Sequence, residues 1–307
     1  MLDMRAQDLI FRRHALADGM TDPELRRARA KGQLVAVAAG AYLDGDHSAA
    51  LDPVGMHRAR VAAAVVAHDG GIVVSHASAA VLHGLDVGAV NLDRVHLSRE
   101  RRSGGRRTAT LHMHIAPLGP DDVTEIDGVA VTALARTVAD VARSESLDEA
   151  VVIGDSALHR GVVSIADVGA VLERHGRRKG IGAARRAVAM FDGRSESPGE
   201  SLSRIRMRAC GMPAPDLQHE VRTDGGAFVG RVDFFWERWG VVGEFDGMGK
   251  YRLGSGQAGD IVAREKLRED AIRDTGLEVI RWVWTDLGRF DVVKARFERA
   301  CARSRRR

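Results

Sequence analysis

Acidic side chains recur on two neighbouring segments that are typical of paired β-strands. The segments VDFFW and VVGEF are short and rich in β-branched and aromatic residues, and the loop ERWG separates them. Pairing of Trp236 with Val241 across this loop is the expected antiparallel register. In that register Asp233 lies directly opposite Glu244, and the two-residue period of a strand puts Asp246 on the same face. Three carboxylates are therefore expected in one region.

Carboxylates held this close together repel each other unless a cation lies between them. Directly opposed side chains in a sheet have Cβ atoms about 4.5–5.5 Å apart. Oxygen ligands of this kind suit Mg²⁺ or Mn²⁺, which could activate a water and stabilise the leaving oxygen of a phosphodiester. The alternative is that one or more of the acids points into solvent on an exposed sheet face.

A lysine follows the second of these strands. Asp246 and Gly247 end the strand, and Lys250 comes within reach of the same rim. Two acids on adjacent strands with a nearby lysine match the nuclease arrangement written PD-(D/E)xK, in which the lysine stabilises charge on the phosphate. That arrangement has its lysine two residues after the second acid, where this chain has Asp246. Either Lys250 substitutes from the following loop or the chemistry is lost.

Glu200 is a further candidate acid, near the start of a predicted helix. Ser197 is expected at the N-cap, Pro198 at the first helical position and Glu200 at the third, which is a capping box. Capping is one sufficient reason for Glu200. The other is catalysis, because PD-(D/E)xK domains carry an acid on their first helix, and Arg204 one turn on could then be its partner.

The C-terminal third of the chain predicts the element order αβββαβ, the core of the restriction-endonuclease-like fold. Its motifs SPGES, RVDFFW, GEFDGMGKY, EKLREDAIRDTG and VIRWVWTDL resemble those of small domains related to very-short-patch repair endonucleases, over residues 197–287. The resemblance implies that Asp233 and Glu244 hold the metal and that Glu200 assists.

The N-terminus predicts a helix from about Met4 to Arg13, a second helix over ELRRARAKG, and two short apolar strands broken by Gly40. Helix, turn, basic helix and hairpin is the layout of a winged helix-turn-helix, whose second helix enters the major groove of double-stranded DNA. The alternative is a solvated amphipathic helix. The second helix carries the candidate DNA contacts Arg26, Arg27, Arg29 and Lys31.

Three further stretches carry a second family resemblance, over residues 4–190. The segments GMTDPELRRARAKGQLVAVAAGAY and SHASAAVLHGL, with IDGVAVTALARTVADVA, are similar to the AbiEi family of type IV antitoxins. This resemblance implies a DNA-binding transcriptional regulator and, as a partner, a nucleotidyltransferase-type toxin. Many relatives have arginines just before the wing glycine, where this chain has Ala38 and Ala39, so we expect weaker wing contacts to phosphate.

The middle of the chain offers weaker signals. A basic hairpin tip is expected around a Gly-Gly turn, where it could contact the phosphate backbone or simply be solvated. Ser75 is expected to cap a helix that begins at His76. His112 and His114 share one strand face, but no third metal ligand is evident nearby in the sequence. The arginines of the basic tip are Arg101, Arg102, Arg106 and Arg107.

Composition limits the other possibilities. The net charge of +4 is compatible with nucleic-acid contact without demanding it. The two cysteines cannot form a disulfide framework or a metal site, and no apolar run is long enough to cross a bilayer, which favours a cytoplasmic protein without membrane contact.

We therefore expect an α+β N-terminal part, with a winged helix-turn-helix at 1–50 and a mixed α/β second domain at 51–194, and a C-terminal α/β restriction-endonuclease-like domain with a basic tail at 195–307. Three functions follow from this organisation: a DNA-binding regulator of the antitoxin type, an active Mg²⁺-dependent endonuclease directed by the winged helix, or a protein-interaction scaffold for a toxin.

Overall fold

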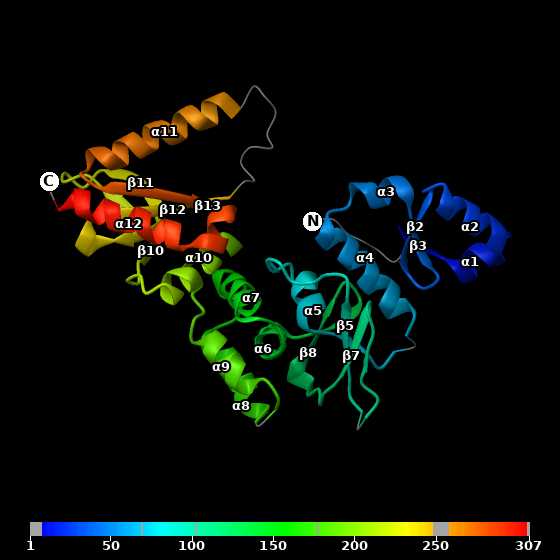
Figure 1. The fold of residues 1–307 in the computed structure, drawn as a ribbon. Helices are drawn as coiled ribbons and strands as arrows, with labels where there is room; N and C mark the ends of the chain where they lie inside the picture. The colour runs from blue at the N-terminus through cyan, green and yellow to red at the C-terminus, as the bar shows by residue number, and fades with distance from the viewer. Residues whose placement is uncertain (1–7, 69, 102, 177, 248–257, 306–307) are drawn as a thin grey trace. The chain divides into compact units, whose positions relative to one another are not determined.

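The structure is a computed structural model that describes residues 8–68, 70–101, 103–176, 178–247 and 258–305, with only the backbone for residues 258–264. Both helices and strands occur throughout, so the chain is of the mixed α and β class (Figure 1). Its contacts divide it into two compact units. The first is Met1–Ile153 with Val162–Ala189, and the second is Gly154–Gly161 with Met190–Arg307.

The first unit begins with a three-stranded sheet and two short helices. The strand order is β1-β3-β2, with all neighbours antiparallel. Ala15, Leu25 and Tyr42 pack the two helices onto the sheet. The elements are β1 (Ile10–Phe11), α1 (Arg12–Ala17), α2 (Asp22–Ala30), β2 (Leu34–Ala38) and β3 (Ala41–Asp44).

Local sequence signals explain the second helix and the turn after β2. Glu24 accepts hydrogen bonds from both the backbone N–H and the hydroxyl of Thr21, over 2.8 and 2.7 Å, which is the capping box that starts α2. Gly40 has a φ of +70°, a left-handed conformation that glycine adopts without a Cβ clash, and it turns the chain from β2 into β3.

The sequence expectation for the first helix was wrong in part. Ile10 and Phe11 form a strand that pairs with Tyr42 and Ala41, and α1 begins only after them. Pairing with β3 satisfies the backbone hydrogen-bonding groups of Ile10 and Phe11, which a longer helix would satisfy within itself. Local propensity does not decide between the strand and the helix at these two residues. Residues 4–7 of the expected helix lie outside the described residues.

A six-stranded mixed sheet follows, in the order β6-β7-β5-β4-β9-β8. Val61, Val74, Leu97 and Val131 form its core against α4. The elements are α3 (Gly45–Ala50), α4 (Pro53–Val66), β4 (Val73–Val74), α5 (His76–Leu82), β5 (Val95–Arg99), β6 (Arg106–Arg107), β7 (Leu111–Ile115), the 3₁₀ helix Pro120–Asp122, β8 (Val123–Ile126) and β9 (Val129–Thr132).

The expected basic hairpin between β5 and β7 was also wrong. These strands are parallel, with Val95 opposite Leu111 and Arg99 opposite Ile115, so the basic segment crosses over between them. β6 then pairs antiparallel with β7 at the edge of the sheet. Both arrangements suit the same alternation of apolar and polar residues, because side-chain period does not specify strand direction.

Helices complete the first unit: α6 (Leu134–Ser144), α7 (Leu147–His159), α8 (Ile165–Arg174) and α9 (Ile181–Val188). Helix α8 starts at a capping box formed by Ser164 and Asp167. Residues 154–159, the C-terminal part of α7, belong to the second unit. Among the described residues, no helix combines the length and apolar character that crossing a membrane requires.

The second unit has the element order predicted from the sequence. Its sheet runs β10-β11-β12-β13, with β12 and β13 parallel and the other neighbours antiparallel. Trp236 and Phe297 belong to the core between the sheet and α12, whereas Val242 and Ile272 belong to the core beneath α11 (Figure 1). The elements are α10 (Pro198–Ala209), β10 (Asp216–Arg222), β11 (Phe228–Trp236), the 3₁₀ helix Glu237–Trp239, β12 (Val241–Asp246), α11 (Ala258–Asp274), β13 (Glu278–Val283), the 3₁₀ helix Trp284–Arg289 and α12 (Asp291–Ser304).

Candidate functional site

An open pocket in the second unit collects the acidic residues singled out in the sequence. Glu200 comes from α10, Asp233 from β11, and Glu244 and Asp246 from β12, and all four line this pocket. Gln218 on β10 lines it as well. Four consecutive elements therefore contribute polar side chains to one hollow, which we call the acidic pocket. Lys250 lies outside the described residues.

The hairpin register at the base of the acidic pocket is the predicted one. Trp236 pairs with Val241, and pairing continues to Phe234 and Gly243. Beyond that point the Asp233 carboxylate accepts a hydrogen bond from the backbone N–H of Phe245 at 2.8 Å.

Glu244 is the most enclosed of the acids on β12. It is 5% exposed, and its two oxygens contact Arg268 Nη2 and Arg281 Nη2, each at 2.7 Å. Burial raises the pKa of Glu244, while the two guanidinium groups oppose that shift. Asp246 is partly exposed and lies 3.5 Å from Arg281. The charge of Glu244 is thus balanced by two arginines.

Glu200 contacts both the start of α10, where it was expected to cap the helix, and the wall of the acidic pocket, where it was expected to assist catalysis. It accepts the Ser197 hydroxyl at 2.7 Å and the Glu196 N–H at 2.9 Å, which caps α10. It also accepts an N–H of Gln218 at 2.9 Å, on the wall of the acidic pocket. Nothing in the sequence around Gln218 signals this contact, because it depends on a φ of +54° at that residue in β10.

The proposed partnership of Glu200 with Arg204 was wrong. Arg204 instead contacts Asp155 at 2.7 Å and donates to the carbonyl of Met190 at 2.7 Å. Asp155 is fully buried, and burial raises its pKa to about 6 even with Arg204 beside it. The fully buried Asp155 needs a counter-charge. Glu200 needs one less, because its carboxylate already accepts three hydrogen bonds.

The donors of the acidic pocket are carboxylate and amide oxygens, the ligand type that Mg²⁺ or Mn²⁺ prefers. Asp233 and Glu244 are the residues that would hold such an ion. Among the described residues, however, no three of these acids bring ligand atoms within 4.8 Å of one another. A divalent ion here would take at most two of the described carboxylates and complete its coordination with water.

The predicted DNA-contacting residues of the first unit lie on the surface. Arg26, Arg27, Arg29 and Lys31 are exposed on α2 and just after it, and Leu25 is the buried residue of that helix. Among the described residues, no acidic side chain forms an ion pair with any of these four cations. Arg26 and Arg29 also line a shallow groove between α2 and β2. Of the other basic candidates, Arg101, Arg106 and Arg107 are exposed, and Arg102 lies outside the described residues.

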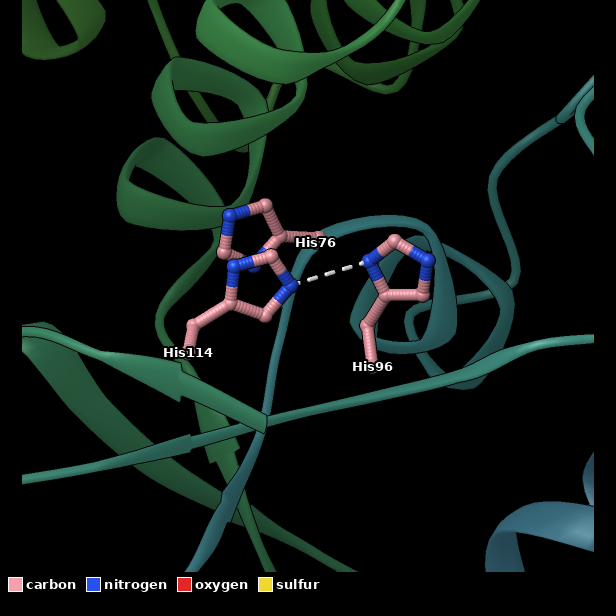
Figure 2. Close-up of side chains that lie close together, drawn as sticks. All are labelled: His76, His96 and His114. Carbon is pink, nitrogen blue, oxygen red and sulfur yellow. Dashed lines mark hydrogen bonds between the residues drawn. The ribbon is translucent and has the colours of Figure 1, made fainter. Parts of the chain in front are cut away.

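Histidines from three elements meet beside the paired strands β5 and β7 of the six-stranded sheet. Figure 2 shows His76 at the start of α5, His96 on β5 and His114 on β7. The His76 and His114 rings stack with centroids 3.7 Å apart, and His114 Nε2 lies 3.2 Å from His96 Nδ1. Burial lowers the pKa of His96 to about 3 and also lowers those of His76 and His114, so the rings are neutral. The ring centroid of His112 lies 3.6 Å from that of His114, with the two rings tilted by 33°.

The sequence offered His112 and His114 as a same-face pair without a third ligand. The structure brings two further histidines to His114. His96 lies beside it because β5 runs parallel to β7, and His76, which has a φ of +53°, stacks its ring on that of His114. Ser75 is the N-cap residue of α5 as predicted, but its side chain makes no capping hydrogen bond. Its hydroxyl oxygen instead lies 3.0 Å from His76 Nδ1 and accepts the Ser98 hydroxyl at 2.8 Å.

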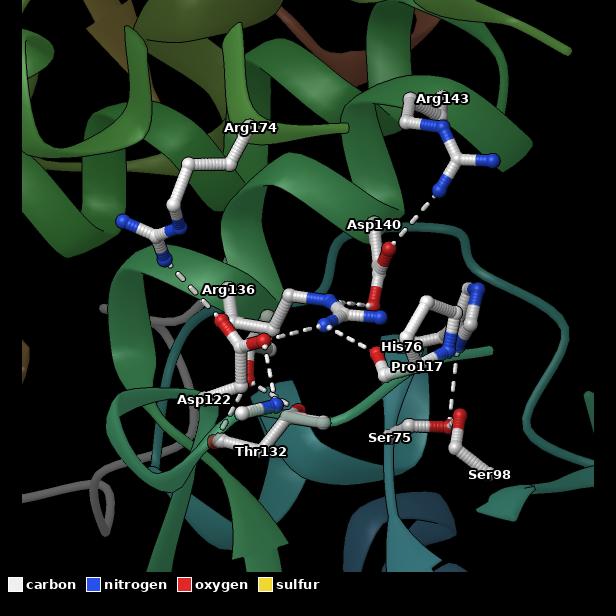
Figure 3. A network of polar contacts seen from close by, with 12 residues as sticks. Ser75, His76, Ser98, Pro117, Asp122, Thr132, Arg136, Asp140, Arg143 and Arg174 are labelled. Atoms are coloured by element: carbon white, nitrogen blue, oxygen red, sulfur yellow. Dashed lines mark hydrogen bonds and ion pairs between the residues drawn. The ribbon is translucent and has the colours of Figure 1, made fainter. Parts of the chain in front are cut away.

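A buried arginine organises the neighbouring charges (Figure 3). Arg136 is 1% exposed and contacts Asp140 at 2.7 Å and Asp122 at 3.0 Å. Arg143 reaches the second oxygen of Asp140, and Arg174 reaches the second oxygen of Asp122. The acids and arginines compensate one another, which is the condition for burying such charges.

Comparisons with known proteins give relatives without a stated activity. No family model matches the chain. Two Mycobacterium tuberculosis proteins, named uncharacterized protein MT2308 (strain CDC 1551 / Oshkosh) and uncharacterized protein Rv2248 (strain H37Rv), are each 30% identical over 231 residues, which is 75% of this chain and 81% of theirs. The crystal structure of the Rv2827c protein from Mycobacterium tuberculosis has 14% identity and a TM-score of 0.38, over 71% of this chain and 85% of that one. A similarity this low carries no argument about fold or function.

Proposed function

Because this chain belongs to the same family as the two Mycobacterium tuberculosis proteins, whose names state no activity, we propose a function from its own residues. It is a DNA-binding protein of the AbiEi antitoxin and transcriptional-regulator type, with a winged helix-turn-helix at its N-terminus and a nuclease-like C-terminal domain.

The observation that carries this proposal is the exposed basic face of α2. Helix α2 follows α1 after a short turn and precedes the β2–β3 hairpin, which is the order of a winged helix-turn-helix. Arg26, Arg27 and Arg29 are exposed. Arginines that form no ion pair in the described part of the chain are available to phosphate and base edges, whereas arginines engaged in ion pairs would first have to give up those contacts. A helix of this kind fits the major groove.

A salt-dependent binding assay tests the proposal. Full-length protein is titrated against two fluorescent duplexes, one from the DNA upstream of its own gene and one of random sequence, at several salt concentrations. We expect Arg26→Ala/Arg27→Ala to weaken binding to both duplexes and to lower the salt slope by about 0.9 for each phosphate that the variant no longer neutralises.

The matched control is Arg185→Ala/Arg186→Ala, which removes an adjacent pair of exposed arginines from α9. Its affinity and salt slope should equal those of the wild type. Two results would contradict the assignment of α2 as the DNA-contacting helix. One is an affinity that does not change between low and moderate salt, and the other is an equal loss of affinity in both double variants.

A second candidate function is metal-dependent cleavage of DNA, and the acidic pocket is the observation that favours it. An ion held by Asp233 and Glu244 would supply an activated water and charge stabilisation at the phosphate. Gln218 and Glu200 would orient the groups around it through their hydrogen bond. Arg231, on the same lining, would help to hold the DNA phosphate, although it contacts Glu196 through both of its terminal nitrogens at 2.7 Å.

Nicking of supercoiled plasmid in Mn²⁺ or Mg²⁺ tests this second function. Asp233→Asn is the most informative variant, because an amide oxygen can still accept the Phe245 N–H while the negative charge is lost. Cleavage by the wild type that disappears in Asp233→Asn and Glu244→Gln supports the site. Cleavage that survives both changes would mean that the activity comes from another site or from a contaminant. If the wild type does not cleave, the acidic pocket is a non-catalytic part of a DNA-binding protein.

A further inference from the structure

We propose that His76, His96 and His114 form a binding site for one divalent transition-metal ion of the zinc class. Each of the three side chains offers one ring nitrogen, and these nitrogens all lie within 4.8 Å of one another. They come from three elements that are distant in the sequence, α5, β5 and β7 (Figure 2). This site is separate from the acidic pocket, and it does not depend on the DNA-binding or cleavage proposals.

The spacing of two of the nitrogens already approaches that of a metal site. Zinc–nitrogen bonds are about 2.0–2.1 Å long, which places neighbouring ligand nitrogens of a tetrahedral ion about 3.3 Å apart. His114 Nε2 and His96 Nδ1 are separated by 3.2 Å. Both side chains extend from adjacent parallel strands whose backbones hold them in place, with His96 opposite His112 and Ser98 opposite His114.

The third histidine has a polar contact outside the cluster in the present ring orientation. The Ser98 hydroxyl donates to Ser75, and the Ser75 oxygen lies 3.0 Å from His76 Nδ1. Outer contacts of this kind orient histidine ligands in metal sites. His76 also has a φ of +53°, a conformation that a non-glycine residue adopts only when its surroundings require it.

The donor set selects the class of ion. Three imidazole nitrogens suit Zn²⁺, Co²⁺, Ni²⁺ or Cu²⁺, whereas Mg²⁺ and Ca²⁺ prefer oxygen. The two sites of this chain therefore differ in the metal that they would take. Three protein ligands also leave one position of a tetrahedral ion for water or another small ligand.

Metal binding requires one local rearrangement. His76 and His114 stack with an interplanar angle of 14°, and two stacked rings cannot both direct their in-plane lone pairs at one ion. The His76 ring must therefore rotate about its side-chain torsions when the ion binds. The backbone of α5 and the strands can stay in place, because only ring orientations change.

The test uses the full-length protein, freed of metal with a chelator and then titrated with Zn²⁺ or Co²⁺. We expect one ion per chain, no competition from millimolar Mg²⁺, and the visible absorption bands of tetrahedral Co²⁺. His76→Asn, His96→Gln and His114→Gln should each weaken binding at least about 100-fold, since loss of an outer contact alone costs about 10–100-fold. Asn is chosen at position 76 because it tolerates a positive φ.

His112→Gln is the matched control, because His112 neighbours His114 on the same strand face but is not one of the three ligands. It should bind within a few-fold of the wild type. The Co²⁺ spectrum of the wild type keeps the proposal testable if a ligand variant does not fold. Absence of tetrahedral Co²⁺ bands, binding that survives all three ligand changes, or an equal loss of affinity in His112→Gln would overturn the assignment.

Discussion

Arg268 on α11 donates through Nη2 to Oε1 of Glu244 on β12 over 2.7 Å. Arg281, on the neighbouring strand β13, contacts the other oxygen of the same carboxylate at 2.7 Å. Glu244, one of the two acids proposed above to hold a metal, is therefore also the charge that joins a helix to the sheet. Its removal should affect stability as well as any chemistry.

Glu244→Gln should lower the free energy of unfolding by about 2 kcal/mol, because Arg268 and Arg281, which are both partly buried, each lose the closest of their charged partners. Asp246→Asn is the matched control on the same strand. Asp246 is partly exposed and lies 3.5 Å from Arg281, so its loss should cost less than about 1 kcal/mol. Urea denaturation of both variants measures the difference, and equal effects would contradict the structural role of Glu244.

Arg136→Met should destabilise the first unit by about 3–5 kcal/mol, because it leaves Asp122 and Asp140 without their buried partner. Arg174→Ala removes an arginine from the same network, but its side chain is 53% exposed, and we expect a loss of stability below about 1 kcal/mol. Thermal or urea unfolding compares the two. A small effect of Arg136→Met would mean that the two acids become protonated or hydrated at little cost.

Acid should destabilise the first unit through His57. This residue is fully buried between the carbonyl of Leu92 and the hydroxyl of Ser78, and burial lowers its pKa to about 4. Arg60 lowers the same pKa further, and Asp93 opposes it. Because the unfolded chain binds this proton below about pH 6.5 and the folded chain does not, stability is complete above that pH and is lost as the pH falls to about 4.

The contribution of His57 over this range is about 3 kcal/mol. Other buried histidines act in the same direction, so the measurement compares slopes. Unfolding free energies are determined at pH 7.5 and at pH 4.5 for the wild type and for His57→Asn. On going from the higher to the lower pH, the variant should lose about 2.5 kcal/mol less stability than the wild type. Parallel pH profiles would show that His57 does not titrate as its burial requires.

Ala39→Arg should strengthen DNA binding. Ala39 is exposed in the turn between β2 and β3, where an arginine could reach the phosphate backbone in the proposed docking geometry. Neutralising one more phosphate should steepen the salt slope by about 0.9. Ala166→Arg adds the same charge at an exposed position of α8 and should leave the slope unchanged. An equal rise in affinity in both variants would indicate a general charge effect in place of a wing contact.

The sequence by itself determined what local rules govern. The N-cap residue Ser197 of α10, the turn at Gly40 and the register of Trp236 with Val241 follow from residues a few positions apart, and the structure has all of them. The order of helices and strands in the second unit was predictable for the same reason, since each element carries its own periodicity and end signals.

Only the tertiary structure decided which distant residues meet. Arg204 reaches Asp155, 49 positions away, in place of the nearby Glu200, because a fully buried carboxylate needs a counter-charge. His96 joins His114 because β5 and β7 run parallel, and strand direction leaves no trace in the alternation of side chains. Side-chain period determines the face on which a residue lies, but the path of the chain determines what lies opposite that face.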